Sequence, residues 1–187
     1  MQWDAILVQV FNPAIFAAVV WLVGMWLEKR IFQRMEEERQ FGQLIMDQRL
    51  KVYHETAPLL NDLLCFYTRV GCWKDLTPPQ ILKIKRQLDR TIHIARPLFS
   101  DPFFVEYQAF IGLCFEMYLG KGENAKLRCK LENYRDFLVN WQSEWEPMFT
   151  STDKATKSEN IHIAYERLMS IFASELGLKR ITKKAEE

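Results

Sequence analysis

The chain has 187 residues, with 25 lysines and arginines against 24 aspartates and glutamates. This balance excludes a global electrostatic field that would by itself dictate a nucleic-acid partner. Glycine and proline number seven each, which argues against a β-rich or loop-rich fold. The cysteines lack CxxC spacing, so we expect buried thiols rather than disulfides or zinc ligands. They are Cys65, Cys72, Cys114 and Cys129.

An apolar run without a charged side chain occupies residues 5–27. At 1.5 Å of rise per residue, a helix of this length can cross a hydrocarbon core about 30 Å thick. A cleaved signal peptide would begin with basic residues, and Met1 to Asp4 include none. A core helix of a globular domain would show a polar face, which residues 13–27 lack. We therefore expect a transmembrane helix within residues 1–27.

Basic residues flank this run on one side only. Lys29, Arg30 and Arg34 follow it, and no basic residue precedes it. The positive-inside rule then predicts a single-pass protein of the inner (cell) membrane, with its N-terminus outside and residues 28–187 in the cytosol. Trp3 and Trp26 lie near the two ends of the run, where indole rings prefer the membrane interface.

Polar and small residues within the run indicate contacts between helices. Gln9 and Asn12 are three residues apart, on one face of a helix, and Pro13 follows them. Polar side chains in a membrane span face other helices or water rather than lipid. Ala14 and Ala18 provide a small surface for close helix approach. We expect Gln9 and Asn12 to line a pore or to contact another span.

The rest of the chain has helical periodicity throughout, and the predicted fold class is all-α. A charged helical stalk is expected over residues 28–43, because apolar residues are few and scattered there. A bundle of about five helices is expected over residues 44–177. Residues 178–187 are expected to be a charged, frayed tail.

Helix boundaries within the bundle are predicted from capping and proline signals. Thr77 before two prolines should start a helix that ends before Pro97, and Ser100 or Asp101 before Pro102 should start the next. Gly120 should close that helix, and Ser158 should start a last helix that ends at Gly177. The other expectations are a kink or break at Pro58 and a helix over residues 123–146.

No sequence motif for catalysis or metal binding is recognisable, so neither an enzyme nor a cofactor is expected. One pattern bears on this point, because Arg49 and His54 match the RxxxxH signature of HEPN ribonucleases. Histidine as general acid or base and arginine as phosphate anchor would suit RNA cleavage. Five residues on a helix, however, separate two side chains by about 140°. Two exposed polar residues are the simpler interpretation.

A basic helix face gives the predicted ligand site. Lys83, Arg86, Arg90 and His93 recur at helical spacing within residues 79–96, opposite an apolar stripe. Such a face could bind the phosphates of a nucleotide or oligonucleotide, or anionic lipid head groups. The alternative is a solvated face packed near acidic residues of a neighbouring helix.

Aromatic residues also recur at helical spacing in the last part of the bundle. They are Tyr134, Phe137, Trp141 and Trp145. Aromatic rings can stack on nucleic-acid bases. Their burial also dominates packing energetics, so we expect this stripe to belong to the core or to a subunit interface.

The order of parts is a short outer N-terminus, one span, a charged stalk and a helical bundle. This order resembles small single-span membrane effectors of bacterial anti-phage defence. It resembles the channel-forming subunit of the Hailong system and is similar in plan to the pore-forming accessory protein of type VI CRISPR loci. The resemblance implies a homo-oligomer controlled by a DNA oligomer from a partner nucleotidyltransferase, and depolarisation on infection. It covers the layout of the chain and assigns no site residue.

Together these patterns predict a ring-shaped channel of four or more copies, gated through the cytosolic bundle by a nucleotide or a short DNA or RNA ligand. A partner enzyme would make that ligand. A second hypothesis is a membrane-tethered scaffold whose bundle binds a cytosolic protein. A HEPN-like ribonuclease is the third.

Overall fold

The computed structural model describes residues 13–117, 120, 122, 124–138 and 140–178. The chain divides into an N-terminal unit, residues 1–45, and a C-terminal unit, residues 46–187. One long helix, α2 (Pro13–Thr68), contributes residues to both units. The described elements are predominantly helical, which confirms the all-α prediction.

The described part of the N-terminal unit is helical, and its apolar side chains are exposed. Phe16, Trp21 and Trp26 are each more than half exposed, and so are most large apolar residues between them. At the end of this stretch, the Arg30 guanidinium lies 4.5 Å from the centre of the Trp26 ring. An apolar helix surface of this kind normally contacts a partner or a lipid phase.

The predicted transmembrane span lies only partly within the described residues. Residues 5–12, which include Gln9 and Asn12, lie outside them. Across the described residues, no helix combines the length and the apolar character needed to cross a membrane.

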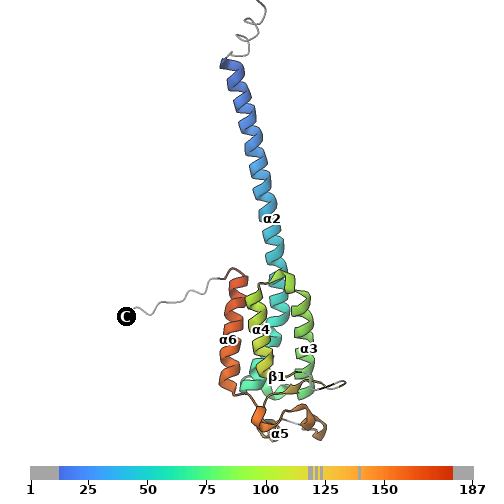
Figure 1. Ribbon diagram of the computed structural model, residues 1–187. Coiled ribbons are helices and arrows are strands. Elements are labelled where there is room, and N and C mark those ends of the chain that lie inside the picture. Colours follow the sequence, from blue (N-terminus) through green and yellow to red (C-terminus); the bar gives the residue numbers. More distant parts are fainter. Residues whose placement is uncertain (1–12, 118–119, 121, 123, 139, 179–187) are drawn as a thin grey trace, which may run out of the picture. The chain divides into compact units, whose positions relative to one another are not determined.

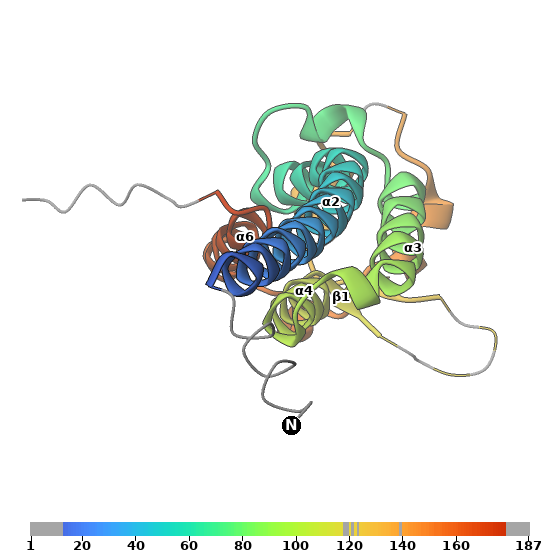
Figure 2. The same ribbon diagram turned by 90° about the horizontal axis from the view of Figure 1, so that it is seen from above.

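In the C-terminal unit, α3 (Pro78–Ile94), α4 (Asp101–Cys114) and α6 (Ser158–Glu175) lie around residues 46–68 of α2 (Figures 1 and 2). A two-stranded antiparallel sheet joins Phe115 to Leu127 and Glu116 to Lys126. The remaining elements are short. They are β1 (Phe115–Glu116), β2 (Lys126–Leu127), α5 (Glu132–Arg135), η1 (Trp73–Asp75), η2 (Arg96–Leu98), η3 (Ser143–Met148) and η4 (Thr152–Lys154).

Most predicted helix ends are confirmed, and local hydrogen bonds account for them. At the start of α3, the N–H and O–H groups of Thr77 donate to Gln80 Oε1 at 2.7 and 2.9 Å. Helix α6 ends in a Schellman motif, in which Leu178 N–H donates to the Ala173 carbonyl at 2.9 Å. Gly177 has φ of +67° there, a conformation that glycine adopts without strain.

Of the kink or break predicted at Pro58, the break is wrong, because α2 continues through it to Thr68. A proline within a helix leaves the carbonyl four residues earlier without its amide partner. Here that carbonyl belongs to His54, and both His54 and Pro58 are exposed. Water can therefore satisfy the carbonyl, and packing of the opposite side of α2 keeps the helix intact.

The predicted helix over residues 123–146 is also wrong, as is the closure of α4 at Gly120. Helix α4 ends at Cys114, and the Arg128 N–H donates to the Cys114 carbonyl at 2.9 Å. Leu127 is fully buried, and Asn140 has φ of +60°. Pairing with β1 and burial beneath the helices override the helical periodicity of this segment.

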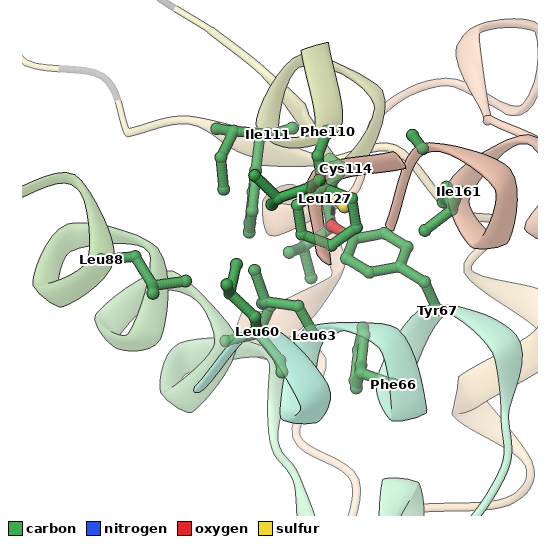
Figure 3. Close-up of a cluster of buried hydrophobic side chains, with 14 of the residues drawn as sticks. Leu60, Leu63, Phe66, Tyr67, Leu88, Phe110, Ile111, Cys114, Leu127 and Ile161 are labelled. Carbon is green, nitrogen blue, oxygen red and sulfur yellow. Dashed lines mark hydrogen bonds between the residues drawn. The ribbon is translucent and has the colours of Figure 1, made fainter. Parts of the chain in front are cut away.

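The core of the C-terminal unit combines apolar side chains with satisfied tyrosine hydroxyls (Figure 3). Leu60 and Leu63 of α2 point toward residues of α4 and β2, whereas Phe66 stacks on Tyr134 of α5, and all three are fully buried. The Tyr67 hydroxyl donates to the Cys114 carbonyl, and the Tyr134 hydroxyl donates to the Phe66 carbonyl at 3.0 Å. These bonds remove the cost of burying two phenols.

Three of the four cysteines are buried, as predicted, and Cys72 is exposed. Burial raises the pKa of the Cys114 and Cys129 thiols well above the usual range. Burial, together with the neighbouring Cys72, raises the pKa of Cys65. Because the thiolate is the reactive form, a brief iodoacetamide treatment of the folded protein should modify Cys72 and spare the other three. Peptide mass spectrometry measures this, and rapid modification of Cys114 would contradict the buried assignment.

Candidate anion-binding groove

Helix α3 has one buried face and one basic face. Ile81, Leu88 and Ile92 are fully buried and attach the helix to the core. The basic face lies beside residues 46–68 of α2, and the Thr91 hydroxyl donates to Glu55 Oε1 of α2 at 3.0 Å. α3 follows α2 after a short connection and runs back along it (Figure 1).

A groove of about 740 Å³ lies between these two helices. Its charged and polar lining comes from both helices, and so does its apolar lining. The cations are Lys51, Lys83, Arg86 and Arg90; the other polar residues are Gln48, Glu55, Gln87 and Thr91; the apolar residues are Val52, Ile94, Ala95 and Leu98. Four cations against one carboxylate give the groove a net positive charge.

The structure brings three of the four predicted ligand residues together in this groove. Lys83, Arg86 and Arg90 line it, but His93 does not. His93 Nδ1 lies 2.7 Å from the Asp89 carbonyl, which it can reach only as an N–H donor. Its ring packs edge-on against Phe104 at 5.2 Å. His93 therefore supports the contact between α3 and α4.

The single acid of α3 does not neutralise the groove. Asp89 accepts hydrogen bonds from Lys85 Nζ at 2.6 Å and from the Tyr107 hydroxyl at 2.7 Å. Neither Lys85 nor Asp89 is among the groove residues. This network instead holds α3 against α4.

The groove cations keep donors available for a ligand. Arg86 Nη2 donates to Asn124 Oδ1 at 2.6 Å, which leaves other N–H groups of the guanidinium free. Between described residues, no ion pair involves Lys51, Lys83 or Arg90. Unpaired cations on facing helices attract anions, and arginine forks match the geometry of phosphate oxygens.

Sequence reasoning missed the contribution of α2. Lys51 and Glu55 are one helical turn apart and belong to the same groove as Lys83. Their charges alternate along α2, a pattern common on solvated helix faces. Only the pairing of α2 with α3 identifies them as groove residues.

The two residues of the RxxxxH pattern, Arg49 and His54, have different surroundings. Arg49 donates to the Leu98 carbonyl and to the Glu175 carbonyl, both at 2.6 Å, and pairs with the Glu175 carboxylate at 3.1 Å. Its guanidinium thereby satisfies carbonyls at the end of η2 and at the end of α6. His54 is exposed and contacts the Tyr53 ring. A structural role therefore accounts for Arg49.

The aromatic residues of the predicted stripe are mainly part of the core. Tyr134 stacks on Phe66 at 4.6 Å, and Tyr134 and Trp145 are buried. Trp141 contacts Trp145 and Phe149. Phe137 is exposed by 54%. The expected core role is confirmed for Tyr134 and Trp145, although no single helix carries the four residues.

Within the described residues, no group of three or more histidine, cysteine or carboxylate side chains could hold a metal ion. The groove has four cations in its lining, and its chemistry suits a phosphate-bearing ligand. No protein-family model, curated protein or solved structure matches the chain.

Proposed function

We propose that this protein is a membrane-anchored, homo-oligomeric channel whose C-terminal unit binds a phosphate-bearing ligand, a nucleotide or an oligonucleotide. The observation that carries the proposal is the groove between α2 and α3, with Lys51, Lys83, Arg86 and Arg90 in its lining. Clustered surface cations that have no acidic partners attract polyanions strongly.

The character of the N-terminal segment supports the membrane anchor. The uncharged run of residues 5–27 is long enough to span, and its described side chains from residue 16 onward are exposed. Trp26 and Arg30 form a cation–π contact where the run gives way to charge. Tryptophan and arginine are typical of a membrane boundary. The proposed orientation places residues 28–187 in the cytosol.

The polar residues of the run support self-association. One span offers Gln9 and Asn12 no partner of its own, whereas a ring of four or more copies gives them a lumen. Because α2 is one continuous helix from Pro13 to Thr68, it contains both residues of the proposed anchor and the groove residues Lys51 and Glu55. A ligand that favours one arrangement of the copies would then gate the channel.

The layout also supports a role in antiviral defence. Its likeness to single-span anti-phage effectors extends the proposal to a partner enzyme that makes the ligand on infection. Opening of the channel would then depolarise the cell membrane and arrest growth.

Reconstitution of the full-length protein tests the channel. In phosphatidylethanolamine–phosphatidylglycerol vesicles, potassium flux should exceed that of empty vesicles, and detergent-extracted particles should be closed rings. Replacing both polar residues, Gln9→Leu with Asn12→Leu, should change the flux several-fold, because the lumen loses its polar groups.

Membrane incorporation of the double variant should match that of the parent protein. Gln33→Leu, an exposed glutamine outside the run, is the control and should leave the flux unchanged. Monomeric particles without flux would overturn the channel and favour the tethered scaffold.

A further inference from the structure

The two ends of the groove differ in chemistry. Lys83 and Arg86 lie toward the start of α3, whereas Ile94 and Leu98 lie at its end and beyond. Ile94 is 72% exposed, the largest exposed fraction among the large apolar residues that the structure describes in the C-terminal unit. One end of the groove is therefore basic, whereas the other end is open and mainly apolar, with Lys51 of α2 as its one cation.

A carboxylate lies between these ends. Thr91 donates to Glu55 Oε1 at 3.0 Å, and this bond places Glu55 level with Thr91 along α3. Because five residues separate Arg86 from Thr91, Glu55 lies about 7.5 Å beyond Arg86 along the axis of α3. A carboxylate has about four lone-pair positions, so Glu55 can accept further hydrogen bonds after the one from Thr91.

A carboxylate at this position disfavours a uniform polyanion. It would repel a phosphate bound level with Thr91, and beyond that level the groove offers a phosphate chain one cation, Lys51, beside the exposed Ile94. Both features suit a ligand that is anionic at one end and has an apolar ring with N–H donors at the other.

We propose that the groove binds a guanine nucleotide, an inference that rests on the proposed ligand function. Its phosphates contact Lys83, Arg86 and Arg90, and its base lies against Val52 and Ile94. Among the common bases, guanine alone presents two adjacent N–H donors, at N1 and at the 2-amino group. A carboxylate accepts both, so Glu55 selects the base while the cations bind the phosphates.

Calorimetric titration of the full-length protein in detergent tests this assignment with GTP, ITP, ATP and inorganic triphosphate. GTP should bind about tenfold or more tightly than ATP, in line with the discrimination of a bidentate pair. ITP lacks the 2-amino group and should bind with intermediate affinity. Glu55→Gln should remove most of the preference for GTP, because the amide presents one acceptor and one donor group.

Asp47→Asn is the matched control, since Asp47 is an exposed carboxylate of the same helix outside the groove lining. It should retain the preference for GTP. Equal affinity for GTP, ATP and triphosphate, unchanged in Glu55→Gln, would overturn base recognition and leave the anion site standing. Absence of binding by all four probes would overturn the ligand function as well.

Discussion

Replacing Phe172 with alanine should lower the free energy of unfolding of the C-terminal unit by about 4 kcal/mol. The side chain is fully buried in α6. Its ring lies 4.7 Å from Phe103, 5.1 Å from Tyr53 and 5.5 Å from Phe99, so it joins α6 to α2 and α4. The loss is a large fraction of the 5–15 kcal/mol that typically stabilises a domain.

Urea unfolding of the full-length protein in detergent, followed by far-ultraviolet circular dichroism, measures this change. Ile163→Ala is the control on the same helix, because Ile163 is 45% exposed. Its loss should stay below about 1 kcal/mol. Equal destabilisation by the two substitutions would contradict the placement of Phe172 in the core.

Reversing two groove charges, Arg86→Glu with Arg90→Glu, should weaken binding of inorganic triphosphate more than about 100-fold. Hydrogen bonds to charged groups contribute about 1.5–3 kcal/mol each, and each 1.4 kcal/mol is tenfold in affinity. The two new carboxylates would also repel the ligand. Calorimetric titration gives the affinity, and vesicle flux in the presence of triphosphate gives the effect on gating.

Lys130→Glu with Arg167→Glu changes the net charge equally at exposed positions outside the groove. This control should reduce triphosphate affinity only by a small, salt-dependent factor. Thermal unfolding should show that both double variants remain folded. If both reduced affinity alike, the attraction would come from overall charge, and the groove would lose its role.

Local chemistry made most helix ends predictable. Thr77 and Gly177 act through hydrogen bonds to residues at most five positions away, so the sequence contains the whole signal. The segment after α4 could not be predicted in the same way. Its Leu127 pairs through the backbone with Phe115 of β1 and with Phe149, and such non-local pairing leaves no periodic pattern.

The candidate site was predictable on one helix and hidden on the other. Relative to Lys83, the 100° rotation per residue places Arg90 about 20° away, Arg86 about 60° and His93 about 80°. A long arginine reaches the groove from its edge, whereas the shorter imidazole turns to Asp89 and Phe104. Lys51 and Glu55 needed the pairing of α2 with α3, which a single sequence does not provide.

The contacts of Arg49 also set an order of assembly during synthesis. One of its partners, Glu175, is 126 residues further along the chain. During synthesis on the ribosome, the Arg49 guanidinium lacks its Glu175 contacts until α6 has emerged, and the apolar surface that α6 covers stays exposed for the same time. Phe99 and Phe103 stay without their Phe172 contact for the same interval. A chain that stops before α6 therefore leaves an intermediate with exposed apolar surface, and such intermediates are prone to aggregation.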